Sequence, residues 1–240
     1  MFLTTFAVPC AACDHTEKIA DLLSRTIKDS ERAFTDCKVW RADPAKTIVA
    51  VAALQKLSAS GQPSTFDHGV YGLSVFVVTT GDGEILHRFV ESDWLTSDAI
   101  SLSGISIDTV RYRLANDVTA FGVRTTRSNP GAEVTTLDLY VAGAGNLTRV
   151  LKGLNVVSHF SESRHDHDCY HASETDRTVA IAKSNTRGYA DLVIREKNVV
   201  TEPKRSRGEC TMKETRFAGR YLLRFDGNIY PKPKALQIEY

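Results

Sequence analysis

The hydrophobic pattern of the chain changes its period near Cys37, and this change most constrains the fold. Between Ile19 and Ile27 the apolar residues recur at helical spacing, and Asp14 and Glu17 have the spacing of a capping box. These features predict one N-terminal helix. Beyond Cys37 the apolar runs are β-branched or alternate with a period of two, which is typical of strands.

Short glycine-rich turns separate most of the predicted strands. Gly81-Asp82-Gly83, Asn129-Pro130-Gly131 and residues 184–188 each stand between two β-rich runs, so each predicts a hairpin. Residues 220–227 and a short tail around Ile229 predict the last pair. We therefore expect a mainly β fold, an antiparallel β-sandwich of about ten or eleven strands with one N-terminal helix. A small β-propeller is the alternative, because several glycine-containing turns weakly resemble one another.

Alternation within two of these strands predicts which side chains are buried. Val110, Tyr112 and Leu114 are expected to share a buried face, with the intervening arginines on the other face. In the run 135–141, Asp138 and Tyr140 are expected to point outward. Both strands are thus interpreted as half-buried members of antiparallel sheets.

The N-terminal run MFLTTFAVPCAAC has a short apolar stretch followed by small residues. This resembles the end of a secretory signal peptide, so we interpret residues 1–12 as a signal or targeting remnant. Ala-Ala-Cys is also a partial match to a lipoprotein cleavage box, which would place a lipid anchor at Cys13.

No linker divides the remainder, and residues 13–240 are expected to form a single β-rich domain. No stretch approaches the ~20 apolar residues of a transmembrane helix, so no transmembrane segment is expected.

The chain has five cysteines. The preferred pairing is Cys13 or Cys10 with Cys37, and Cys169 with Cys210, because each pair brackets a compact local segment. Disulfides favour a periplasmic or secreted location. The alternative is a cytoplasmic protein in which Cys10-Ala-Ala-Cys13 is a redox motif or half of a zinc site.

Charge and motifs exclude several functional classes. Thirty basic residues nearly balance twenty-nine acidic ones, giving a formal charge of +1. Nucleic-acid binders usually carry a concentrated basic face, so no nucleic-acid partner is expected. The one basic cluster, Lys204, Arg205 and Arg207, is short and is interpreted as a solvated turn. The sequence contains no phosphate-binding loop, dinucleotide fingerprint, nucleophile elbow or zinc-protease motif.

The segment SRHDHDCYH, residues 163–171, holds the densest group of chemically active side chains. His165, His167 and His171 could bind zinc as three imidazole ligands and leave an open catalytic position. The other interpretation is a polar surface loop between strands, spanning residues 161–176, that presents Cys169 to Cys210. Three ligands from one loop would be poorly held, which favours the second interpretation.

Three segments resemble a known group of proteins: CKVWRADPAKTIVAVA (37–52), TLDLYVAGAGNLTRVLKGLNVV (136–157) and YLLRFDGNIYP (221–231). They are similar to segments of uncharacterised exported β-rich proteins of Gram-negative bacteria, which carry a signal peptide and paired cysteines at comparable places. The resemblance implies a bacterial envelope or secreted location. It brings no known activity and no site residues.

Three functional hypotheses follow, one of which is a purely structural envelope component that is lipid-anchored at Cys13. The first is a non-catalytic periplasmic or secreted β-sandwich that binds a protein partner, of inhibitor or immunity type, and needs no cofactor. The alternative is a metal-dependent hydrolase that uses the cluster of His165, His167 and His171.

Overall fold

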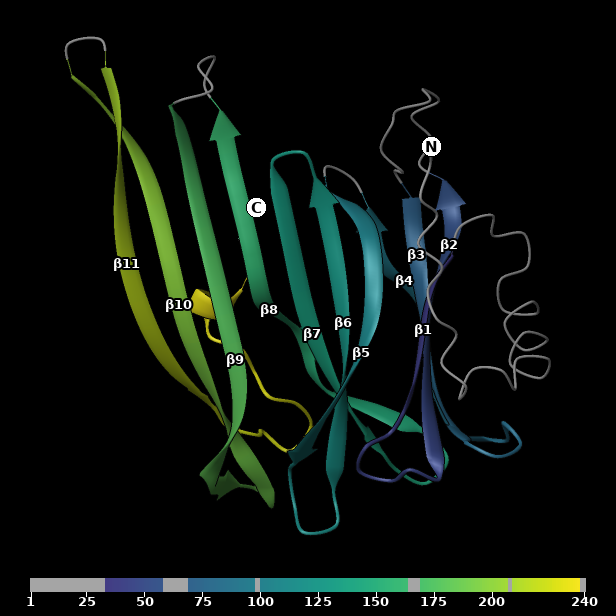
Figure 1. Ribbon diagram of the computed structural model, residues 1–240. Helices are drawn as coiled ribbons and strands as arrows, with labels where there is room; N and C mark the ends of the chain where they lie inside the picture. Colours follow the sequence, from purple (N-terminus) through teal and green to yellow (C-terminus); the bar gives the residue numbers. More distant parts are fainter. Residues whose placement is uncertain (1–32, 58–68, 98–99, 164–168, 207–208, 238–240) are drawn as a thin grey trace.

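The computed structural model describes residues 33–57, 69–97, 100–163, 169–206 and 209–237 (Figure 1). The expected N-terminal helix and signal remnant lie outside these ranges, so both stay predictions. No helix in the described ranges is long and apolar enough to cross a membrane.

Eleven described strands form two antiparallel sheets, and within each sheet the strands are paired in sequence order. The four-stranded sheet contains β1 (Ala33–Val39), β2 (Lys46–Leu57), β3 (Gly69–Thr79) and β4 (Ile85–Ser97). The seven-stranded sheet contains β5 (Ser101–Arg113), β6 (Thr119–Asn129), β7 (Ala132–Ala142), β8 (Leu147–Ser163), β9 (Tyr170–Thr186), β10 (Tyr189–Ser206) and β11 (Glu209–Leu223). The predicted mainly β, antiparallel organisation is confirmed. The two continuous sheets are not the radial blades of a propeller.

The four-stranded sheet packs against the part of the seven-stranded sheet formed by β5, β6 and β7. Ile48, Val75 and other β-branched side chains of β2 and β3 meet Phe121 and Tyr140 in one buried cluster. Trp40 joins this cluster with an edge-on contact to Phe121, at 5.6 Å between ring centroids. Figure 1 shows this packing at the right, where the two sheets are not closed.

A second core lies beneath the C-terminal tail, residues 224–237, which ends in the short 3₁₀ helix η2 (Lys234–Leu236). Phe225, Tyr230 and Leu236 of the tail bury apolar residues of β7, β8 and β10. The Tyr230 hydroxyl donates a 2.7 Å hydrogen bond to the Ala190 carbonyl, which fixes the tail to β10. The tail therefore covers one half of β10 and leaves the other half outside this core.

The structure corrects the two predicted side-chain faces. Asp138 and Tyr140 are buried, not outward, because β7 lies between both cores: Leu137 and Leu139 face the tail cluster, and Tyr140 faces the four-stranded sheet.

Val110 is 51% exposed, although it was expected on the buried face beside Tyr112. The pairing of β5 with β6 shifts between Asp108 and Tyr112, and this irregularity breaks the alternation.

Three predicted boundaries are also wrong. The expected polar loop over residues 161–176 is mostly strand, because β8 continues to Ser163 and β9 begins at Tyr170. Residues 220–223 do not pair with the tail; they belong to β11, which begins at Glu209 and pairs with β10. Lys204, interpreted as part of a basic turn, lies within β10.

Candidate functional site

A β-bulge in β8 places a backbone amide beside the buried carboxylate of Asp138. Leu137 pairs with Leu154 and Leu139 pairs with Leu151, so β8 holds one extra residue in this interval. Gly153 takes this place with φ of 56°, a left-handed conformation that favours glycine. Its N–H donates to Oδ1 of Asp138. The bulge thus provides one of the donors that a buried carboxylate requires.

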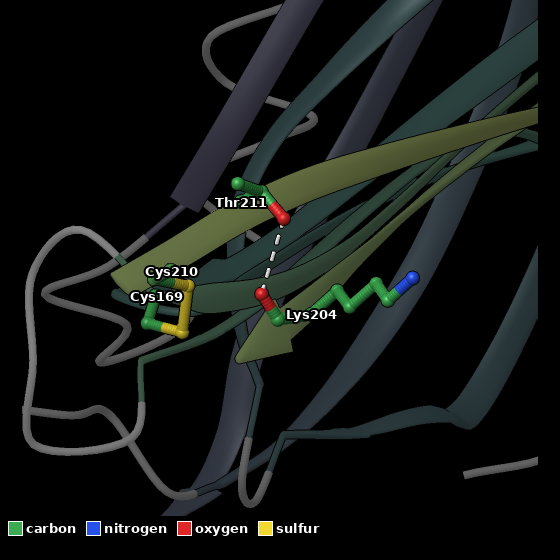
Figure 2. Close-up of a disulfide and its surroundings, with 4 residues drawn as sticks. All are labelled: Cys169, Lys204, Cys210 and Thr211. Carbon is green, nitrogen blue, oxygen red and sulfur yellow. Dashed lines mark hydrogen bonds between the residues drawn. A yellow bond between two sulfur atoms is a disulfide. The ribbon is translucent and has the colours of Figure 1, made fainter. Parts of the chain in front are cut away.

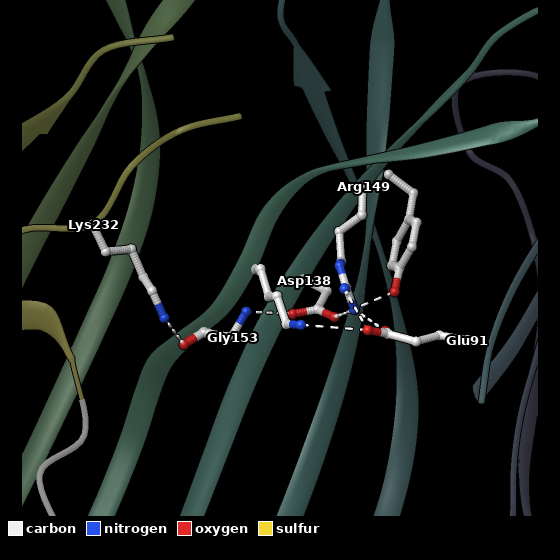
Figure 3. Close-up of polar contacts among 7 residues, drawn as sticks. Glu91, Asp138, Arg149, Gly153 and Lys232 are labelled. Atoms are coloured by element: carbon white, nitrogen blue, oxygen red, sulfur yellow. Dashed lines mark hydrogen bonds and ion pairs between the residues drawn. The ribbon is translucent and has the colours of Figure 1, made fainter. Parts of the chain in front are cut away.

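Arg149 connects the two sheets through this carboxylate. Its guanidinium donates to both oxygens of Glu91 on β4, at 2.7 and 3.1 Å, and to Oδ2 of Asp138 at 3.2 Å. The hydroxyl of Tyr140 donates to the same Oδ2 at 3.2 Å. Figure 3 shows these groups in a row that runs from Lys232 on the tail to Glu91.

The electrostatics of the row follow from burial and from the central cation. Burial raises the pKa of Asp138, although the Arg149 charge and the Gly153 N–H oppose this. Burial also acts to raise the pKa of Glu91, but Arg149 outweighs it and the pKa is lowered. Burial lowers the pKa of Lys232. The positive charge of Arg149 therefore partly offsets the negative charges of two carboxylates, of which Asp138 is the more deeply buried.

A cavity of about 370 Å³ opens beside Asp138, between β4, β6, β7, β8 and the tail. Trp94 contributes an aromatic wall, and Arg127, Lys152 and Lys232 contribute positive charge. Such a lining suits a small molecule with an anionic group and an apolar part. However, Lys152 lies 3.4 Å from a Glu91 oxygen, and Lys232 donates to the Gly153 carbonyl. These two ammonium groups are already held by groups of the protein itself.

A disulfide joins Cys169 to Cys210, as the sequence predicted, with their Cα atoms 5.8 Å apart. It ties the start of β9 to the start of β11 across the end of β10 (Figure 2). Beside it, the Thr211 hydroxyl donates a 3.1 Å hydrogen bond to the Lys204 carbonyl. Cys37 is also disulfide-bonded. Cys10 and Cys13 lie outside the described residues, so the choice between them stays a prediction.

This disulfide closes a part of the molecule that we call the sheet arm: residues 169–177, 197–206 and 209–218. The sheet arm lies at the left of Figure 1, at the end of the seven-stranded sheet away from the four-stranded one. Among its residues whose side chains are described, Cys169, Ala172 and Thr175 are the buried ones. Three large apolar side chains stand in solvent: Tyr170 at 39%, Met212 at 37% and Phe217 at 56% exposure.

The expected zinc ligands are not brought together in the described part of the chain. His165 and His167 lie outside it, and His171 is exposed on β9. Within the described ranges no group of three or more metal-ligating side chains could hold a metal ion. The zinc hypothesis thus gains no support from these residues.

Sequence reasoning missed both Arg149 and the exposed position of Phe217. Arg149 stands in the apolar run 147–157, and an arginine in such a run could have indicated a buried ion pair. Phe217 had no such signal, because the strand that holds it was not predicted.

Comparison of the chain with protein-family models, with curated proteins and with solved structures found no match in any of the three.

Proposed function

We propose that the protein is a non-catalytic periplasmic or secreted β-sandwich that binds a protein partner through its sheet arm, in the manner of an inhibitor or immunity protein. The observation that carries this proposal is the exposure of Tyr170 and Met212 on one face of the arm and of Phe217 on the other, on strands that a disulfide holds together. Large aromatic and methionine side chains are enriched at protein interfaces.

Rigidity of the arm supports the same function. A surface that is ordered before binding loses less conformational entropy when a partner docks. Fifteen residue pairs join β10 to β11, and the disulfide adds a covalent link at their far end. The arm can therefore present apolar side chains without the burial that normally orders them.

The state of the cavity beside Asp138 also favours the arm as the binding surface. Asp138, Lys152 and Lys232 already pair with groups of the protein itself, so a ligand would have to displace these contacts. The apolar side chains of the arm impose no comparable cost. An export pathway accords with the disulfide, since such bonds persist in oxidising compartments.

Site-specific photocrosslinking tests the proposal. We would replace Phe217 by the photoreactive residue p-benzoylphenylalanine in the native host and irradiate intact cells. One discrete adduct with another protein is expected, and the purified pair should bind each other in calorimetry. If that partner is an enzyme, adding the protein should lower its activity.

Val110 provides the matched control, because it is 51% exposed on β5, outside the arm. The photoreactive residue at position 110 should capture nothing discrete. Identical adducts from both positions, or none from position 217, would contradict binding through the arm.

A further inference from the structure

We propose that β11 also pairs with β11 of a second copy of this chain, antiparallel and centred on Thr215. β11 is fifteen residues long and forms one edge of the seven-stranded sheet. In the described part of the chain, β10 is the strand that pairs with it. The outer backbone N–H and C=O groups of such an edge are available to another strand.

Symmetry restricts how two copies of one edge can pair. A two-fold axis perpendicular to the sheet keeps every side chain on its own face. Residues directly opposite each other in an antiparallel pair also share a face. One residue must therefore lie on the axis opposite its own copy, and residues equally spaced from it must oppose each other.

With Thr215 on the axis, the charges of β11 become complementary. Glu214 then lies opposite Arg216 of the second copy, and Arg216 opposite that copy's Glu214. Within one chain these two side chains already form an ion pair at 2.9 Å, with 47% and 77% of their side chains exposed. Pairing would join the two exposed ion pairs into one group of four charges that alternate in sign.

The apolar positions agree with the same register. Met212 lies opposite Ala218 of the second copy, and Phe217 lies opposite the aliphatic part of Lys213. Phe217 is 56% exposed and Met212 is 37% exposed in the single chain, so pairing would cover one side of each and leave the sheet face open to another partner. No like charges oppose each other between Cys210 and Arg220 in this arrangement.

Neighbouring registers are less favourable. An axis at Lys213, Glu214 or Arg216 places each of these charges against its own copy, which is destabilising. An axis at Thr211 brings Glu209 opposite Lys213 but overlaps only residues 209–213 of each strand. An axis at Phe217 is the competitor with a long overlap, and it brings Glu214 opposite Arg220. Substitution of Arg220 therefore separates the two registers.

Sedimentation equilibrium of the full chain tests this proposal. The wild-type chain should form a dimer that weakens as salt is added. Arg216→Glu and Glu214→Arg should each raise the dimer dissociation constant about tenfold, because each places like charges opposite one another. The double variant Glu214→Arg with Arg216→Glu restores alternation and should dimerise within about threefold of wild type. Arg220→Glu should leave the constant unchanged.

Three results would overturn the proposal: a monomeric wild-type chain, a double variant no better than the single ones, or an equal loss with Arg220→Glu. Circular dichroism of each variant confirms that it is folded, which exposed positions allow. The outcome is independent of the proposed function, because capture of a different protein at position 217 does not require a dimer.

Discussion

Two of the molecule's carboxylate–guanidinium pairs have similar distances, 2.7 and 2.9 Å, but differ in their surroundings. In the inter-sheet core, the Arg149 side chain is 11% exposed and bridges Glu91 and Asp138 across two sheets. In the sheet arm, the Arg216 side chain is 77% exposed and contacts Glu214 on its own strand. The first pair determines how the sheets sit together, whereas the second is available to a partner.

The same contrast holds for the apolar side chains. Phe121 and Tyr140 are fully buried between the sheets, and Phe217 stands in solvent on the arm. The core is ordered by burial, while the arm is ordered by paired strands and one disulfide. One seven-stranded sheet therefore contributes to the buried core at one end and carries solvent-exposed apolar side chains at the other.

Arg149→Met should have the largest effect on stability. Loss of the guanidinium leaves Asp138 and Glu91 without their shared partner, and removal of one member of a buried ion pair typically costs about 3–5 kcal/mol. Urea unfolding followed by circular dichroism measures this loss. Arg216→Met is the matched control, with an expected change within about 0.5 kcal/mol. Similar losses in the two variants would mean that the arm pair is as structural as the core pair.

Removal of the arm disulfide should have the next largest effect. The bond joins residues separated by 41 positions, so cross-linking entropy gives it about 2–4 kcal/mol. We expect Cys169→Ala with Cys210→Ala to lower stability by this amount. Hydrogen exchange should accelerate first at the arm ends of β9 and β11, and the amides of β6 and β7 should keep their protection. Equal acceleration in both places would show that arm and core open together.

Acid should reveal a smaller contribution from Asp108. Burial acts to raise the pKa of Asp108, but Arg124, at 2.8 Å, and the Val110 N–H outweigh it, so the pKa lies below 3.8. Since the folded-state pKa is lowered, Asp108 stabilises the protein at pH above 3.8, and this stability is lost as pH falls through the folded value.

Urea midpoints measured between pH 6 and pH 2 check this effect. The wild-type midpoint should fall more steeply at acid pH than that of Asp108→Asn. Asp93→Asn, at an exposed aspartate of β4, should follow the wild-type curve. Parallel curves for wild type and Asp108→Asn would show that this pair does not stabilise the core.

Much of the fold could be predicted because alternating or β-branched apolar residues are a clear sequence signal for strands. The three predicted hairpins are all present, as β3–β4, β6–β7 and β9–β10. Strand β11 was not predicted as a whole, since residues 210–218 are mostly polar, are exposed or half-buried on both faces, and carry little periodicity. Such segments become ordered when their backbone pairs with a neighbouring strand, and the amino-acid composition does not indicate that pairing.

The candidate sites were harder to predict for a related reason. Alternation assigns one face of a strand to the core, but β7 is covered on both faces, so Asp138 was assigned to solvent. The bulge at Gly153 and the partner Glu91, 58 residues from Arg149, depend on tertiary register. The Cys169–Cys210 pair could be predicted directly, because the two cysteines bracket the hairpin of β9 and β10.

Phe217→Ser should have the smallest effect on stability and the largest on binding. The side chain is 56% exposed, so its removal should change the unfolding free energy by no more than about 0.5 kcal/mol. Calorimetry with the captured partner should nevertheless show at least a tenfold weaker complex, as expected for an aromatic anchor. Val110→Ser, equally exposed outside the arm, should change neither quantity. A Phe217→Ser protein that unfolds more easily, yet binds its partner as before, would assign this side chain to folding and place the binding surface elsewhere.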